Sequence, residues 1–228
     1  MNSTGHNSSL FHFPKWANIL LPAIVVAVVG GGLYMGILIP FGASPATTDV
    51  GYAPIQPVPY SHALHVGKLG IDCRYCHTTV EDASFAAIPP TQTCMNCHTN
   101  ILPDSPKMQP VIESYNTGRP IEWVKVHDLP DYAYFNHAAH VNKGVSCLEC
   151  HGRVDKMEVV YQAETHSMSW CLDCHRDPGP RLRPREFVTQ LDWVPPTGQE
   201  REAQIEQLMQ EYQIKPPALL TDCSTCHR

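Results

Sequence analysis

The chain has 228 residues, of which 17% are charged and 43% are hydrophobic, and its 16 basic and 22 acidic residues give a formal net charge of −6. This length suits one ordinary domain or two small ones. The acidic balance argues against a nucleic-acid-binding protein, which needs a basic face to neutralise phosphates. The 10 cysteines and 13 histidines carry the information, since cysteine spacing separates disulfide, zinc and haem chemistry.

The first predicted element is a membrane-anchor helix at residues 16–41, preceded by a short tail at residues 1–15. No charged residue lies between Lys15 and Asp49. At about 1.5 Å per residue, this apolar run can span a hydrocarbon core of roughly 30 Å. Lys15 and the late position of the next positive charge, Lys68, favour a single pass through the cytoplasmic membrane with a cytoplasmic N-terminus. The alternative is a cleaved signal peptide, for which residues 43–46 are a mediocre cleavage site.

After a linker at residues 42–57, five C-x-x-C-H motifs use every cysteine of the chain. They are Cys73-x-x-Cys76-His77, Cys94-x-x-Cys97-His98, Cys147-x-x-Cys150-His151, Cys171-x-x-Cys174-His175 and Cys223-x-x-Cys226-His227. This spacing is typical of c-type haem attachment, in which two thiols add to the vinyl groups and the histidine binds the iron. Zinc sites and disulfides would leave the histidine after each pair unexplained. We therefore predict five covalently bound haem c groups on the outer face of the membrane, with each motif histidine as the proximal iron ligand.

The second, distal iron ligands are sought among the other histidines. Thirteen histidines less five proximal ones leave eight, and two of these precede the anchor helix. Two H-x-x-H pairs stand out, and each comes shortly before a haem motif. We expect four distal ligands from them: His62, His65, His137 and His140. The fifth ligand is His127 or Met168, and a methionine would raise the reduction potential of its haem.

The two H-x-x-H pairs also reveal a duplication, because residues 61–68 align with residues 136–143 and two haem motifs follow each segment. The pentahaem domain at 58–228 thus divides into a di-haem module at 58–98, a connector at 99–132, a second di-haem module at 133–175 and an extension with the fifth haem at 176–228. One convincing helix begins at Thr197 or Gly198 and ends before Pro216. Segments 49–60 and 100–120 are expected to be loops.

The fold class predicted is a multihaem cytochrome c, in which loops and short α-helices wrap around five haems. The soluble part is too short to build an apolar core around each cofactor, so the porphyrins must form much of the core. Closely packed haems permit electron transfer between them, which makes the chain an electron carrier with no catalytic residues of its own.

The order of several motifs resembles the pentahaem cytochrome c subunit of alternative complex III, within the broader class III multihaem cytochromes. The segments that carry this resemblance are Leu69–His77, Ile88–Thr91, Val126–Pro130, Phe135–His137 and Met168–Cys171. The resemblance implies an electron-transfer role in a quinol-oxidising respiratory complex that passes electrons to a periplasmic cytochrome c or a terminal oxidase. It implies as partners an iron–sulfur subunit, polytopic quinol-binding membrane subunits and a mono-haem cytochrome c. It does not decide between His127 and Met168.

Two other functions remain as alternatives. A free-standing, membrane-anchored multihaem quinol dehydrogenase would also have one anchor helix, but it would need a quinol pocket beside a haem. A multihaem reductase would need an open iron position, and the supply of histidine and methionine ligands argues against one.

Overall fold

The computed structural model describes residues 14–42 and 47–227. The chain divides into two units, residues 1–47 and 48–228, and this boundary falls within the predicted linker. Most of the predicted cytoplasmic tail, and the candidate cleavage site at 43–46, lie outside the described residues.

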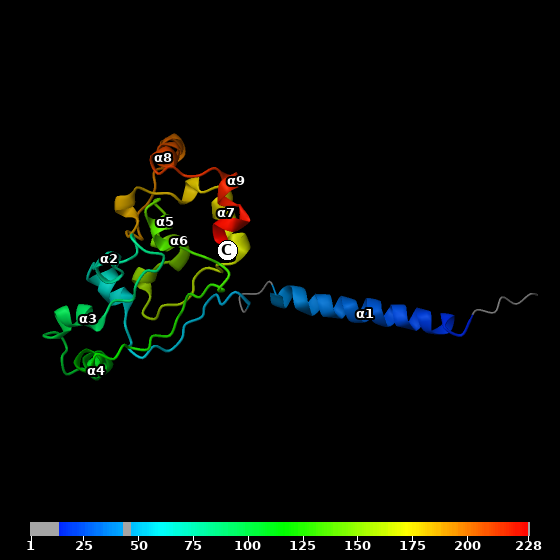
Figure 1. Cartoon of the computed structure of the whole chain (residues 1–228), viewed down its shortest axis with the longest axis horizontal. Helices are drawn as coiled ribbons and strands as arrows, with labels where there is room; N and C mark the ends of the chain where they lie inside the picture. The colour runs from blue at the N-terminus through cyan, green and yellow to red at the C-terminus, as the bar shows by residue number, and fades with distance from the viewer. Residues whose placement is uncertain (1–13, 43–46, 228) are drawn as a thin grey trace, which may run out of the picture. The chain divides into compact units, whose positions relative to one another are not determined.

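The first unit contains one long helix, α1 (Ala17–Gly42), drawn in blue in Figure 1. It has no buried residue and no charged one, and it is long and apolar enough to cross a membrane. A helix that exposes almost only apolar side chains is unstable in water but suits a lipid environment. The helix is therefore consistent with the predicted membrane anchor.

The second unit consists of short helices joined by loops (Figure 1), and its described residues form no strand beyond one isolated bridge between Val145 and Leu182. Its α-helices are α2 (Cys73–Cys76), α3 (Thr91–His98), α4 (Gln109–Thr117), α5 (His137–Val141), α6 (Cys147–His151), α7 (Met168–Arg176), α8 (Gly198–Glu211), α9 (Pro217–Leu220) and α10 (Cys223–Cys226). A π-helical turn, η2 (Ala63–Lys68), and the 3₁₀ turns η3 (Pro106–Met108), η4 (Val154–Lys156), η5 (Gly179–Arg181) and η6 (Arg185–Phe187) complete it. The predicted mixture of loops and short helices is confirmed.

Buried apolar side chains form three small clusters and no single large core among the described residues. One cluster is centred on Val111, one on Val188 and one on Leu182. Three separate clusters of this size cannot by themselves offset the conformational entropy of ordering some 180 residues. The arrangement agrees with the expectation that bound porphyrins supply much of the interior.

Helix α8 is the longest helix of the second unit and confirms the predicted C-terminal helix. Thr197 is its N-cap residue, and the helix ends at Glu211, before Pro216. Its buried face, Leu208 with Tyr212 just after the helix, packs against Leu182. The Tyr212 hydroxyl accepts a hydrogen bond from the Arg185 backbone N–H at 3.0 Å, so the helix is held by both apolar and polar contacts.

The C-terminal extension is also tied to the third haem motif through Glu149, which lies between that motif's two cysteines. The Glu149 carboxylate accepts from the Arg181 and Arg183 guanidinium groups at 2.8 and 3.3 Å. Arg183 is only 4% exposed and lies over the Trp193 ring at 5.1 Å. A guanidinium buried this deeply requires such a partner, and the pairing joins the extension to the second module.

The prediction that residues 100–120 form a loop is wrong in part, because α4 occupies 109–117. Pro110 lies in the first helical turn, where its missing N–H costs nothing, and Val111 is buried against Met108 and Val58. Gly118, with φ 71°, ends the helix in a left-handed conformation. Tertiary burial therefore overrides the loop-like composition.

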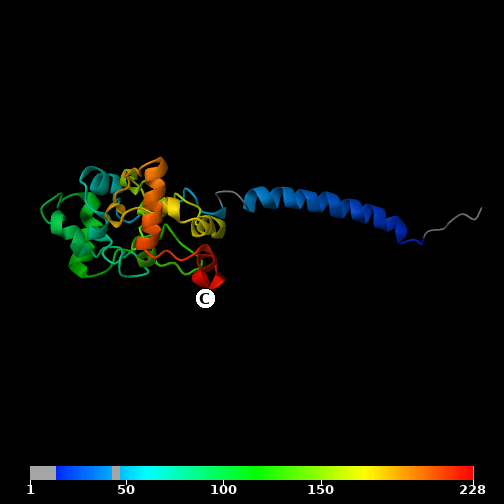
Figure 2. The ribbon, with the colours of Figure 1, turned by 90° about the horizontal axis from the view of Figure 1, so that it is seen from above.

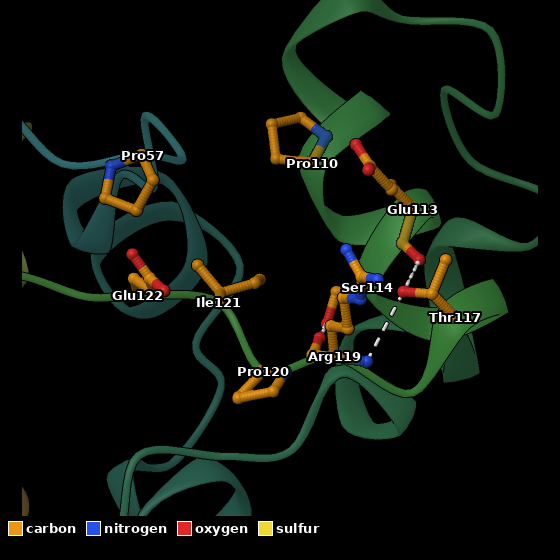
Figure 3. A pocket seen from close by; sticks show the side chains of 9 residues that line it. All are labelled: Pro57, Pro110, Glu113, Ser114, Thr117, Arg119, Pro120, Ile121 and Glu122. Carbon is orange, nitrogen blue, oxygen red and sulfur yellow. Dashed lines mark hydrogen bonds between the residues drawn. The ribbon is translucent and has the colours of Figure 1, made fainter.

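An open pocket lies beside α4, between this helix and the segment that follows it (Figure 3). Its volume is about 380 Å³, and prolines, Glu113, Ser114 and Ile121 line it. The Ser114 hydroxyl is turned to the Arg119 carbonyl, to which it donates. Since neither cysteine nor histidine lines the pocket, it is separate from the haem-binding motifs.

Leu208→Ala should destabilise the second unit, because it removes a side chain that is 3% exposed from the Leu182 cluster. The expected loss in the free energy of unfolding is about 2–5 kcal/mol, measured by urea denaturation of the haem-loaded protein. The control is Glu206→Ala on the exposed face of the same helix. Equal stabilities of the two variants would contradict the assigned packing.

Candidate haem-binding site

Short capped helices hold the cysteine pairs. In three motifs the residue directly before the first cysteine caps the helix: Asp72, Ser146 and Asp222 accept the N–H two residues later at 2.8, 3.2 and 2.9 Å. Such caps satisfy amide groups that a helix of four or five residues would otherwise leave unpaired. The two thiols, three residues apart on one turn, then project from the same side of the helix, as attachment to one porphyrin edge requires.

The proximal histidines are oriented by hydrogen bonds from ring Nδ1 to backbone carbonyls. The pairs are His77 with Ala87 at 2.9 Å, His98 with Ile101 at 2.9 Å, His175 with Leu220 at 2.9 Å and His227 with Tyr132 at 3.0 Å. Because a carbonyl only accepts, each Nδ1 must carry the proton, and Nε2 is left with its lone pair available for a metal. Histidines that bind metals commonly have this outer hydrogen bond.

The proximal histidine of the third motif has a different partner. The His151 Nδ1 lies 3.3 Å from the His127 Nε2, and the two rings meet edge to face at 4.4 Å between centroids. Burial lowers the pKa of His151 well below its usual value, and it lowers that of His127 to about 4. Both rings are therefore neutral, and one must donate to the other.

Three of the four H-x-x-H histidines also pair Nδ1 with a backbone carbonyl. His65 and His140 each place Nδ1 2.8 Å from a carbonyl four residues earlier, and His137 places Nδ1 2.8 Å from the Ser84 carbonyl. The His62 Nδ1 is buried without a hydrogen-bond partner. Burial, then the nearby His77 and His65, lowers the pKa of His62 to about 4, so this ring is also neutral and able to bind a metal.

The distal and proximal candidates meet in facing pairs. Ring centroids are 6.2 Å apart for His65 and His98, 6.3 Å for His137 and His151, and 6.1 Å for His140 and His175. Two imidazoles that bind opposite sides of one metal through bonds of about 2 Å have centroids about 6 Å apart. His62 lies close enough to His77 for their charges to interact.

This donor arrangement fits haem. Three distal candidates each face one motif histidine, and within residues 14–42 and 47–227 no group of three or more histidine, cysteine or acidic side chains could hold a metal ion. The rings of His127, His151 and His166 lie together, at 4.4–6.5 Å between centroids. A zinc site would bring three or four donors together. The cysteine pairs beside facing imidazoles are instead the donor set that covalent haem c requires.

Two aromatic residues that the sequence analysis did not single out support the distal histidines. Tyr60 stacks on His65 at 4.4 Å and meets the edge of His62 at 4.8 Å. Phe135 contacts His140 at 4.5 Å and His137 at 4.8 Å in the same two orientations. The available signal was the repeat itself, because an aromatic residue precedes each H-x-x-H pair at the same offset.

The fifth site is less complete. His127 lies beside His151, as described above, and His166 places Nε2 3.0 Å from the Cys150 carbonyl. The His227 ring contacts the Tyr132 ring, at 5.9 Å between centroids. Met168 is the first residue of α7 and is 63% exposed. None of these contacts pairs His127 or Met168 with His227.

Ser146→Ala should destabilise the third motif, because the Ser146 hydroxyl both caps α6 and donates to the Val188 carbonyl at 2.7 Å. Ser146 is 2% exposed, so its loss leaves a buried carbonyl unpaired, at a cost of about 1–3 kcal/mol. Asp222→Ala, which removes a solvent-exposed cap, should cost less. Urea denaturation compares them, and an equal or larger effect of Asp222→Ala would contradict this role.

The similarity to a known protein agrees with the geometry. The chain is 37% identical over 97 residues to the menaquinone reductase multihaem cytochrome c subunit of Nitratidesulfovibrio vulgaris. The match covers 42% of this chain and 45% of that protein, so the chain spans less than half of its relative. No family model matches the chain. The match supports a multihaem cytochrome c that carries covalently bound haem c and transfers electrons.

Proposed function

We propose that the chain is a membrane-anchored pentahaem electron-transfer subunit of a quinol-oxidising respiratory complex of the alternative complex III type. The observation that carries the proposal is the set of imidazole pairs facing each other at 6.1–6.3 Å beside C-x-x-C-H motifs. A haem iron held by two histidines would have no position left for a substrate, which favours electron transfer over a reductase reaction. Haem c, when bound, supplies reversible one-electron iron chemistry.

Different residues of the chain attach the haems, bind the irons and orient the iron ligands. The ten motif cysteines fix five cofactors by thioether bonds, the five motif histidines act as proximal ligands, and His62, His65, His137 and His140 act as distal ligands. In seven of these nine histidines a backbone carbonyl accepts from Nδ1 and would keep the ring turned toward its iron. Tyr60 and Phe135 pack against the distal rings and restrict their rotation.

The membrane attachment and the partner proteins are inferred from other features of the chain. α1 supports attachment to the membrane, and covalent haem attachment places the second unit on the outer face of the cytoplasmic membrane. One helix offers no enclosed quinol pocket, so we assign the quinol to polytopic partners, with an iron–sulfur subunit and a mono-haem cytochrome c as further partners. The name of the matched relative favours a second candidate, in which the same subunit delivers electrons to menaquinone.

The proposal predicts five covalent haem adducts on the mature chain and its co-purification in mild detergent with polytopic and iron–sulfur subunits. Mass spectrometry counts the adducts, and Cys147→Ala combined with Cys150→Ala should reduce the count by one. Fewer than five adducts on the unaltered chain would contradict the pentahaem assignment. A lone chain that oxidises quinol would instead support a free-standing quinol dehydrogenase.

Met168 is our candidate for the fifth distal ligand. It lies one helical turn before Cys171, and the Cys226 thiol of the fifth motif is close enough to contribute to raising the pKa of Cys171. A ligand at Met168 would thus come from the helix next to the fifth motif. His127 is instead within hydrogen-bonding distance of His151, where it can accept from Nδ1 and orient the third proximal ring.

Met168→Ala and His127→Ala should therefore differ. Met168→Ala should convert one haem from low-spin to high-spin, and Met168→His should restore the low-spin state at a lower reduction potential, because bis-histidine ligation lowers the potential relative to histidine–methionine. His127→Ala should leave all five haems low-spin. Electron paramagnetic resonance and redox titration of the loaded protein measure both, and a high-spin haem in His127→Ala alone would reverse the assignment.

A further inference from the structure

We propose that the five haem-binding motifs are arranged in space in the order second, first, third, fourth, fifth, so that Cys94–His98 and Cys223–His227 are the two ends at which partner proteins exchange electrons. This inference rests on the proposed function and adds the positions of entry and exit. It departs from the order of the motifs along the chain, because the first and second motifs change places.

The first and second motifs are neighbours because they share one short helical turn. His62 lies near His77 of the first motif, and His65 faces His98 of the second at 6.2 Å. Tyr60 contacts both distal rings. The two motifs also touch directly, because the Asn96 side chain of the second motif donates to the Tyr75 hydroxyl of the first at 3.0 Å.

The third and fourth motifs are neighbours for the same reason. His137 faces His151 and His140 faces His175, and both distal rings come from α5. Phe135 occupies the place that Tyr60 has in the first module. Each module therefore holds two adjacent haem-binding sites.

The first motif, rather than the second, joins the two modules. The Cys73 and Cys147 side chains lie close together, and Cys147 packs against the apolar cluster that contains Val80, three residues after His77. The loop after the first motif also binds α5, since the His137 and Ala138 backbone N–H groups donate to Ser84 and Ala83 at 3.1 Å. The second motif instead packs toward α4, on the side away from this junction.

The fifth motif follows the fourth. The His175 Nδ1 donates to the Leu220 carbonyl, and α7 packs against α9, the helix just before the fifth motif. Cys226 contributes to raising the pKa of Cys171, which places thiols of the two motifs near each other. The His227 Nδ1 donates to Tyr132, at the edge of the second module.

Exposure identifies the same two ends. Of the ten cysteines, Cys97 in the second motif and Cys223 in the fifth are exposed, and the other eight are partly buried. Figures 1 and 2 place α3 and α4 at one end of the second unit and α9 at the opposite end. The transfer balances because one partner protein gives up one electron at one end, and a second partner gains one electron at the other end.

A matched pair of variants on the same turn tests the order. His62→Ala vacates the distal position at the first motif, and His65→Ala does so at the second. Each should yield one high-spin ferric haem, whose paramagnetism alters the signals of the haems that adjoin it. We expect His62→Ala to alter two low-spin signals, since the first site has two neighbours, and His65→Ala to alter one.

The opposite pattern, one signal for His62→Ala and two for His65→Ala, would overturn the proposed order and support the order of the chain. Mass spectrometry of the unaltered chain separates this result from failure of the proposed function, which fewer than five adducts would indicate. If a vacated iron recruits another ligand, Soret circular dichroism of Cys73→Ala/Cys76→Ala and Cys94→Ala/Cys97→Ala gives the second measurement. Removal of the first haem should abolish two exciton couplings and removal of the second should abolish one, and the reverse would again overturn the order.

Discussion

The orientation of imidazole rings is the constraint on which the second unit depends. Each donor ring must present Nε2 to a metal, and in seven of the nine motif and H-x-x-H histidines the structure achieves this by giving Nδ1 a backbone carbonyl as acceptor. A carbonyl cannot donate, so the hydrogen bond selects one tautomer as well as one direction. Much of the irregular backbone is explained by this requirement, because loops, unlike strands, have carbonyls free to accept.

The second unit is held together by little apolar packing. Its three apolar clusters are small, and no described strand pairs with another to organise them. The caps at Asp72, Ser146 and Asp222 and the contacts of Tyr60 and Phe135 act within short stretches of chain. The ion pairs of Glu149 with Arg181 and Arg183 connect segments that lie far apart in sequence. These connections converge on the haem-binding motifs, so cofactor binding and folding are coupled.

Because of the duplication, both modules have the same arrangement of histidines and haem motifs. The contacts between the modules determine which motifs are neighbours. Within a module, two histidines on one turn serve two neighbouring sites. Between modules, the proximity of Cys73 to Cys147 and the backbone pairing of α5 with the loop after the first motif connect the halves. In the proposed arrangement, two paired modules and one terminal extension form a linear series with two ends, which would suit an electron-transfer subunit between two partners.

The sequence by itself predicted haem c chemistry, the long apolar helix α1, the duplication and α8, because each depends on spacing or periodicity within a short stretch of chain. It did not predict α4, whose formation depends on burial of Val111 against Met108 and Val58. Nor could it predict that His127 lies beside His151, or that Cys73 lies beside Cys147, since these residues are separated by loops of undetermined path. Tertiary structure alone decided which motifs are adjacent, because contacts between distant segments depend on how the loops close and which side chains are buried together.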